Sequence, residues 1–224
     1  MSIAPRLPLA AAAVLAAGAA VWTLAPRGAS EPPLLAAAAQ DAEAEAPEVA
    51  PMVLGAEDAP VTVVEYASYT CPHCATFHDE VFPALKRDYV DEGLVRFEYR
   101  EVYFDRPGLW ASMVARCDGG MRFFGITDLL YENQSDWRQG EPAQVADGLR
   151  RIGLTAGLTQ EQLDACMSDG AMAQALVANF EANAEEDGIR STPSFLVDGE
   201  LHSNMSEAEF REILDARLAE AGEG

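Results

Sequence analysis

Two of the four cysteines in this chain, Cys71 and Cys74, are separated by only a proline and a histidine. The other two, Cys117 and Cys166, lie far from this pair and from each other in the sequence. A close pair of cysteines can form a redox centre, provide two ligands of a metal site, or make a structural disulfide. The residues around Cys71 and Cys74 must therefore decide which chemistry is expected.

The stretch around the close pair predicts that Cys71 lies at the start of a helix. Apolar or amphipathic residues recur with helical spacing at positions 78, 81, 82, 85 and 89. Thr70 is a suitable N-cap residue, and Pro72 fits the first turn, where its missing N–H is not needed. The unpaired N–H groups and the dipole of a helix start stabilise a thiolate. We therefore expect Cys71 to be a nucleophile with a lowered pKa, and Cys74, one turn later, to be the resolving thiol.

The dipeptide between the cysteines, Pro72 and His73, influences the direction of the redox reaction. His73 adds a hydrogen-bond donor and, when protonated, a positive charge near Cys71. Stabilisation of the Cys71 thiolate favours the reduced protein and makes the disulfide more oxidising. If the potential of this chain lies at the oxidising end, the chain donates its disulfide to other thiols.

Two plainer interpretations of the close pair remain open. The pair could be a structural disulfide. It could also bind a metal together with His78, but a fourth ligand would then be needed and only His73 and His202 remain among the histidines. We expect redox chemistry and no metal, with His78 and His202 as ordinary surface or helix-face residues.

Periodicity along the rest of the chain predicts an α/β fold. The helix that begins at the cysteines should kink at Pro83, which cannot donate an N–H, and end at Gly93. The order of elements is β-α-β, then β-hairpin-α, interrupted by a helical insertion. The expected elements are strands at 59–68 and 94–104, helices from 107 to 187 with breaks near 119–120, 140–142 and 153–159, a β-hairpin at 192–202, and a last helix opened by a capping box at 206–209.

The stretch "VTVVEYASYTCPHC" at residues 61–74 resembles the active-site strand and helix start of the DsbA family of bacterial thiol–disulfide oxidoreductases. That family has a thioredoxin fold with a helical insertion between its β-α-β half and its β-hairpin half. The similarity extends over roughly residues 53–220. It implies a thioredoxin-like domain at 53–224, with its insertion at about 107–187, and an enzyme that needs no bound cofactor.

The resemblance also implies roles for single residues. Cys71 matches the family's nucleophile, Cys74 its resolving cysteine, and the dipeptide between them its tuning pair. Glu65 matches a buried acid that assists proton transfer to and from Cys74, and burial in an apolar strand is expected to raise its pKa. Thr192 and Pro193 match the cis-proline loop that faces the sulfurs, where a substrate peptide could pair with the backbone as an added strand.

Partners and direction follow from the same resemblance. Reduced exported proteins would be the substrates, and a membrane quinone-linked oxidase of the DsbB type would restore the disulfide. The alternative is a periplasmic disulfide reductase or isomerase kept reduced by a membrane donor, since such proteins often carry Thr before the proline, as Thr192 does here. From other classes, a thiol-dependent metal carrier or a redox-inert binding module would also hold two close cysteines.

The distant cysteines are expected to have a different task. An even number of cysteines permits disulfides in an oxidising compartment, and neither Cys117 nor Cys166 has a close partner. We expect a structural disulfide between two helices of the insertion, and a second redox relay has no support in the sequence. The aromatic residues Phe123, Phe124 and Trp137 are expected in the core of the insertion.

The N-terminal part of the chain differs in composition from the rest. Residues 7–24 carry no charge and predict a signal peptide or N-terminal membrane anchor within residues 1–25. Residues 26–52 are mostly alanine, proline and acidic residues and predict a disordered tether. We therefore expect a periplasmic protein that is either soluble after signal cleavage or tethered to the inner membrane.

The chain is strongly acidic, with 37 Asp and Glu against 15 Lys and Arg and a formal net charge of −22. Such a charge disfavours binding to nucleic acid, and the sequence has no Gly-rich phosphate loop or internal repeat. We expect no nucleic-acid partner and a monomer.

Overall fold

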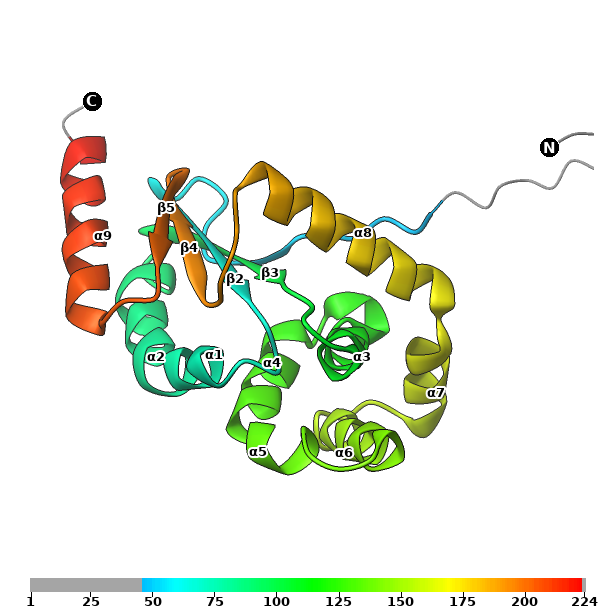
Figure 1. Cartoon of the computed structure of the whole chain (residues 1–224). Helices are drawn as coiled ribbons and strands as arrows, with labels where there is room; N and C mark the ends of the chain where they lie inside the picture. The colour runs from blue at the N-terminus through cyan, green and yellow to red at the C-terminus, as the bar shows by residue number, and fades with distance from the viewer. Residues whose placement is uncertain (1–45, 223–224) are drawn as a thin grey trace, which may run out of the picture. The chain divides into compact units, whose positions relative to one another are not determined.

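The computed structural model describes residues 46–222 (Figure 1). Its centre is a five-stranded sheet with the strand order β1-β3-β2-β4-β5. β2 pairs in parallel with β3, and all other neighbouring strands are antiparallel. The strands are β1 (Met52–Leu54), β2 (Val61–Ala67), β3 (Val95–Glu101), β4 (Ser194–Val197) and β5 (Glu200–Ser203).

The helices fall into three groups that match the predicted order of elements. Together with the sheet they confirm the predicted α/β fold with a helical insertion. Between β2 and β3 lie α1 (Pro72–Thr76), the π-helical turn η1 (Phe77–Val81), α2 (Phe82–Leu85) and a second π-helical turn η2 (Lys86–Val90). The insertion holds α3 (Arg106–Ala115), the 3-10 turn η3 (Cys117–Gly120), α4 (Phe123–Glu132), α5 (Gln134–Trp137), α6 (Pro142–Thr155), α7 (Gln160–Ser168) and α8 (Gly170–Glu186), and α9 (Glu207–Gly222) follows the hairpin.

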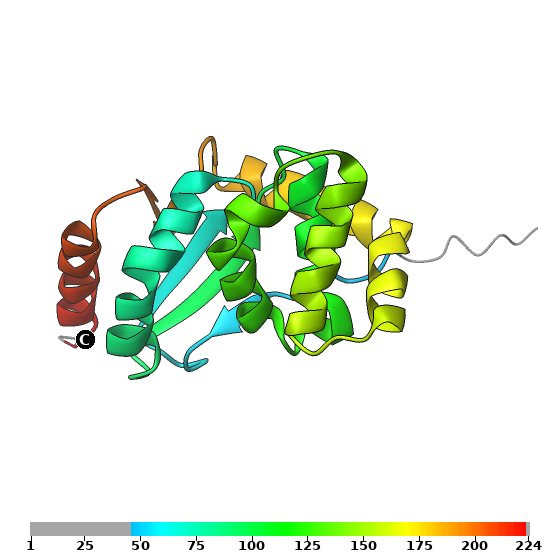
Figure 2. The same ribbon diagram turned by 90° about the horizontal axis from the view of Figure 1, so that it is seen from below.

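Seen from two directions, the insertion and the last helix lie at opposite ends of the described part, although side chains of α4 and α9 belong to the same core cluster. Figures 1 and 2 both place α3 to α7 at one side, while α9 lies at the other. α8 runs back across the sheet and returns the chain to β4 (Figure 1). The capping box predicted for α9 is present, because the Ser206 hydroxyl accepts from the Glu209 N–H and the Ser206 N–H donates to the Glu209 carboxylate.

β2 is buried on both faces, and this decides which of its side chains reach the cysteines. Successive side chains of a strand point to opposite faces of the sheet. Val63 belongs to the large core that also contains Cys74 and Phe77, whereas Val64 belongs to a smaller cluster on the α8 side. Glu65 has the same parity as Val63 and therefore faces the helix that carries the cysteines.

The helix after the cysteines is not simply kinked at Pro83, as the sequence predicted. The chain instead widens into π-helical turns on both sides of α2, and the Phe82 N–H donates to the Phe77 carbonyl five residues earlier. A proline ring crowds the carbonyl four residues before it, and a wider turn relieves that contact. Gly93 ends this helical stretch with φ 74°, which favours glycine.

Several predicted boundaries are shifted. β1 was not predicted, and Met52, the last residue of the predicted tether, pairs with Tyr99 of β3. α6 continues through the break predicted at Gly153 and ends at Thr155. The predicted core role of Phe123 and Trp137 is confirmed, because both side chains are buried.

The predicted signal or anchor at 1–25 and most of the tether, up to residue 45, lie outside the described residues. Within residues 46–222 no helix has both the length and the apolar character that a membrane crossing requires.

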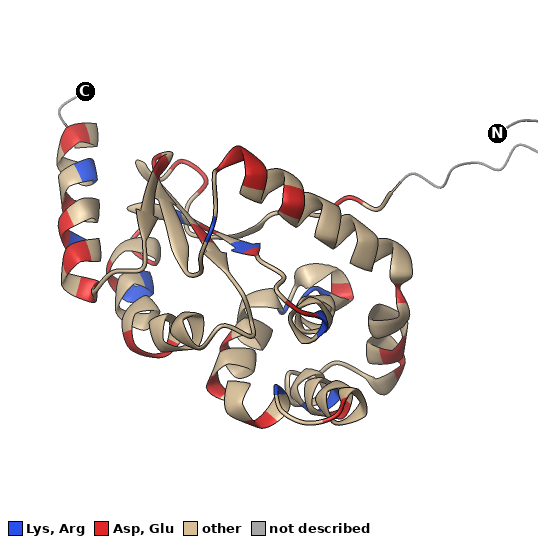
Figure 3. Cartoon of the chain, viewed as in Figure 1, with Lys and Arg blue, Asp and Glu red and all other residues tan. Residues whose placement is uncertain are grey.

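Acidic residues are spread over several elements, including α8 and α9, and do not form a single cluster in the view of Figure 3.

Candidate active site

Cys71 occupies the N-cap of α1, one residue later than the N-cap predicted at Thr70. Its backbone is extended, with φ −81° and ψ 120°, and Pro72 takes the first helical position. The sulfur thus lies at the helix start, as the predicted cap at Thr70 also implied. An N-cap side chain is the one placed to receive the free N–H groups of the first turn, so the Cys71 sulfur takes the position of a capping oxygen.

The surroundings lower the pKa of Cys71 to about 5. The largest cause is a hydrogen bond from the Cys74 side chain, followed by the Thr192 side chain and the backbone N–H groups of Cys74 and His73, while partial burial opposes the shift. His73 thus contributes through its main chain, and its side chain is exposed like that of Pro72. At neutral pH, Cys71 of the reduced protein is therefore a thiolate.

Cys74 has the opposite properties. Its side chain is fully buried, and burial raises its pKa far above the ordinary value of a thiol. Negative charge on Glu65 and Cys71 adds to the effect. Cys71 is therefore the nucleophile of the pair, and Cys74 is the thiol that keeps its proton.

The residues predicted to bind substrate face Cys71. The peptide bond between Thr192 and Pro193 is cis, and the Cys71 Sγ–H donates to the Thr192 carbonyl oxygen at 3.5 Å. The Thr192 hydroxyl is buried without a hydrogen-bond partner among residues 46–222. It is therefore available to donate to the Cys71 thiolate once that forms, in agreement with its effect on the pKa of Cys71. The structure brings together segments 121 residues apart in sequence.

Glu65 is completely buried and is paired with a residue that the sequence analysis placed elsewhere. Its two carboxylate oxygens lie 3.1 and 2.9 Å from Nε2 of His78. The expectation that His78 is an ordinary surface or helix-face residue is therefore wrong, since its side chain is only 2% exposed and its ring stacks on Tyr131. The signal was present in the sequence, because His78 lies four residues after Cys74 and four before Phe82 on the apolar face of the helix.

Insertion residues hold the backbone that leads to the cysteines. The Gln134 side-chain amide donates to the carbonyls of Tyr69 and Cys71 at 2.8 and 3.0 Å. Arg138 donates to the Thr70 carbonyl at 2.7 Å. Neither residue was predicted to belong to the site, since a polar side chain more than sixty positions away carries no local signal of such contacts.

Cys117 and Cys166 form a disulfide across 49 residues. Cys117 lies in η3 and Cys166 in α7, so the bond joins two helical segments of the insertion, the arrangement that the sequence predicted. Among the described residues no group of three or more His, Cys, Asp and Glu side chains is arranged to hold a metal ion, and none forms around Cys71, Cys74 and His78.

A thioredoxin family model matches residues 48–216, which is most of the chain. The chain therefore belongs to the thioredoxin family. Within this family, it is similar to the DsbA proteins: the structure of Wolbachia pipientis α-DsbA1 superposes with a TM-score of 0.71 and 26% identity, covering 78% of this chain and 94% of that one. The resemblance seen in the sequence is thereby confirmed.

Two curated relatives have names that describe disulfide chemistry. A putative protein-disulfide oxidoreductase of Rickettsia bellii is 34% identical over 171 residues, which cover 76% of this chain and 65% of the relative. The disulfide bond formation protein D of Bacillus subtilis is 28% identical over 173 residues, 74% of this chain and 76% of that protein. The chain thus spans just under two thirds of the length of the Rickettsia relative.

Proposed function

We propose that this chain is a protein-disulfide oxidoreductase that donates the Cys71–Cys74 disulfide to exported proteins. The observation that carries the proposal is the position of Cys71 at a helix N-cap beside Thr192 and Pro193, with a pKa lowered to about 5. A thiolate stabilised to this extent makes the reduced protein the favoured form and the disulfide a strong oxidant.

The reaction transfers two electrons from substrate to enzyme. A substrate thiolate attacks Sγ of Cys71, the bond to Cys74 breaks, and Cys74 leaves with the electron pair and takes up a proton. The second substrate thiolate then attacks the substrate sulfur of the mixed disulfide. Cys71 leaves as a thiolate, and the substrate keeps the new disulfide.

The loop at Thr192 and Pro193 is proposed to hold the substrate backbone during this exchange. It precedes β4 and faces the nucleophile, so an extended peptide could pair beside it as an added strand. Such pairing is largely indifferent to sequence, which suits an enzyme with many substrates. A periplasmic location, a quinone-linked membrane oxidase of the DsbB type as electron acceptor, and a monomeric state complete the proposal.

Thr192 itself favours a second candidate, a disulfide reductase or isomerase kept reduced by a membrane donor. The resemblance associates threonine at this position with reductases and isomerases, although its hydroxyl lowers the pKa of Cys71 and so by itself favours a disulfide donor. The two candidates share the mixed disulfide and differ in the reduction potential of the cysteine pair.

The test is the redox equilibrium of the full chain against glutathione, with each cysteine pair followed by mass-tagging. A potential near −120 mV would support a disulfide donor, and one near −270 mV would overturn that direction and favour the reductase. The Cys74→Ala variant provides a second test, since its reaction with a disulfide-bonded peptide should stop at a mixed disulfide on Cys71. Failure to form this adduct would contradict both candidates.

A further inference from the structure

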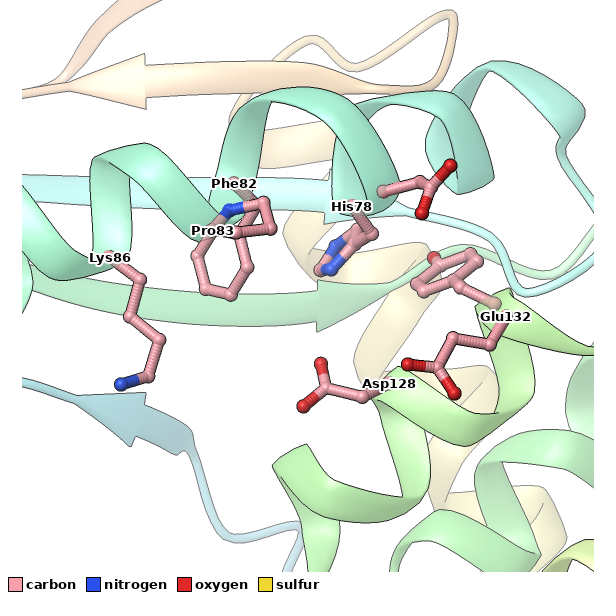
Figure 4. Close-up of a pocket in the computed structure, with 8 residues that line it drawn as sticks. His78, Phe82, Pro83, Lys86, Asp128 and Glu132 are labelled. Carbon is pink, nitrogen blue, oxygen red and sulfur yellow. The ribbon is translucent and has the colours of Figure 1, made fainter.

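A cavity of about 220 Å³ lies between the helical stretch after the cysteines and α4 (Figure 4). The two π-helical turns contribute His78 and Lys86, and α4 contributes Asp128 and Glu132, whose side chains surround the same hollow in Figure 4. At roughly 30 Å³ for each water molecule, the cavity is large enough for several. It reaches from the surface to the ring of His78.

The chemistry proposed above needs a proton at a place that bulk water does not reach. Burial raises the pKa of Cys74, so this sulfur is a poor leaving group unless a proton arrives as the disulfide opens. The Cys74 side chain is 0% exposed. Glu65, the buried acid on the same side of β2, is 0% exposed as well. A proton that passes through Glu65 must therefore come from a further group.

His78 is the group in contact with Glu65. Its Nε2 lies within hydrogen-bond distance of both carboxylate oxygens, at 3.1 and 2.9 Å. Its Nδ1 is buried and has no hydrogen-bond partner in the described part of the chain. The ring thus presents one nitrogen to the carboxylate and leaves the other without a protein partner, in a side chain that lines the cavity.

We propose that His78 carries protons between this cavity and Glu65, and through Glu65 to and from Cys74. The inference rests on the function proposed above and adds a residue and an entry route to it. His78 acts through Glu65 and is therefore a positioning and proton-carrying residue, not one that attacks or leaves in the exchange.

The proton count closes over one turnover. When substrate opens the disulfide, a proton from the cavity enters at Nδ1, the Nε2 proton moves to Glu65, and Glu65 protonates the Cys74 thiolate. When an oxidant re-forms the disulfide, the Cys74 proton returns through Glu65 to Nε2, and the Nδ1 proton leaves to the cavity. The ring returns to its first tautomer without rotating, which suits a ring stacked 4.4 Å from Tyr131.

Charged and titratable groups around the ring come from every element packed against it. They are Glu65 on β2, Tyr99 on β3, Tyr131, Asp128 and Glu132 on α4, Cys74 on α1, and Asp79 and Lys86 in the π-helical turns. Burial raises the pKa of Asp128, while the charge of His78 lowers it. Asp128 lines the same cavity as His78, so it is placed to exchange protons with water there.

The first experiment measures how fast dithiothreitol reduces the Cys71–Cys74 disulfide of the full chain between pH 5 and 9, in H₂O and D₂O. His78→Gln can still donate a hydrogen bond to Glu65 but cannot carry a proton. We expect its rate constant at pH 7 to fall about tenfold or more, with the histidine-dependent step lost from the pH profile. His202→Gln is the matched control, since His202 lies in the β4–β5 hairpin, and should behave like the wild type.

The second experiment separates proton transfer from structural support. His78→Ala enlarges a cavity that is already open, so added imidazole and methylimidazoles of different basicity should restore the rate. A relay predicts that the rescued rate changes with the pKa of the added imidazole, whereas a packing role predicts rescue that depends on size alone. The titration of Cys71 at 240 nm should stay unchanged in both His78 variants.

The outcomes are distinguishable. A wild-type protein that does not exchange its disulfide with dithiothreitol would overturn the proposed function. A wild-type protein that exchanges rapidly, together with a His78→Gln variant of equal rate and pH profile, would overturn only the relay. Rescue that ignores the basicity of the imidazole would also overturn it.

Discussion

The two cysteine pairs of this chain have the same atoms and opposite environments. Cys71 and Cys74 lie three positions apart at a helix start, one half-buried with a lowered pKa and one fully buried with a raised pKa. Cys117 and Cys166 lie 49 positions apart and are joined inside the insertion. The comparison shows that a cysteine pair is reactive when the protein stabilises the thiolate of one cysteine and not of the other. A disulfide that closes a long loop instead stabilises the fold.

A related contrast separates two buried carboxylates on neighbouring strands. Glu101 on β3 binds Arg116 through two hydrogen bonds of 2.5 and 2.7 Å, and the guanidinium stays charged at any accessible pH. Glu65 on β2 binds His78, whose imidazole has two ring nitrogens that can each hold a proton. Both carboxylates lie on the face of the sheet that carries Cys74, but only the charge of Glu65 is among the causes of the raised pKa of Cys74.

The largest expected effect sharpens the difference between the cysteine pairs. Cys71→Ser removes the nucleophile, so the rate of disulfide exchange with a dithiol peptide should fall by about a thousandfold or more. Replacing both Cys117 and Cys166 by Ala should leave this rate within about twofold, since neither contacts the reacting sulfurs. An equal fall in exchange rate in the two variants would contradict the assignment of a redox role to one pair and a structural role to the other.

Stability should show the reverse order. Loss of the Cys117–Cys166 disulfide frees a loop of about 50 residues in the unfolded chain, and we expect the free energy of unfolding in urea to fall by about 4 kcal/mol. Cys71→Ser should change it much less. A double Cys117/Cys166 variant with unchanged urea midpoint would show that the insertion is held by packing alone.

The pH dependence of stability should report the Cys71 thiolate. Its folded pKa of about 5 lies below the ordinary value of 9.0, so the folded reduced protein binds fewer protons in between. The contribution of the Cys71 thiolate to the free energy of unfolding is therefore complete above pH 9 and lost as the pH falls towards 5. Its size is reduced because the sulfur is half exposed to solvent. The oxidised protein has no such thiol. The difference in free energy of unfolding between the reduced and the oxidised protein should thus become smaller from pH 9 to pH 5. Urea unfolding at each pH measures this difference.

The smallest predicted effect concerns Thr192. Thr192→Val removes the hydroxyl that helps to stabilise the Cys71 thiolate, so the pKa of Cys71 should rise by about one unit in a titration at 240 nm. The disulfide should become less oxidising in the same proportion. Thr76→Val is a suitable control on the exposed side of α1, and a shift of equal size there would contradict the specific role of Thr192.

Much of this site could be predicted because its signals are local. The helix start at Cys71 and Pro72 follows from residue types within one turn, and the capping box at Ser206 and Glu209 is equally short-ranged. The burial of Glu65 follows from its place in an apolar strand. The error of one residue at the N-cap had little effect on the chemistry, since either position brings the sulfur to the free N–H groups.

The sequence by itself determined which residues could react, the order of the elements and the division of the cysteines into two pairs. Only the tertiary structure decided that Glu65 meets His78, and that Gln134 and Arg138 hold the loop before Cys71. The physical reason is the distance along the sequence over which each interaction acts. Caps, periods and close cysteine spacing act within a few residues, whereas these contacts depend on how a strand, a widened helix and an insertion pack together.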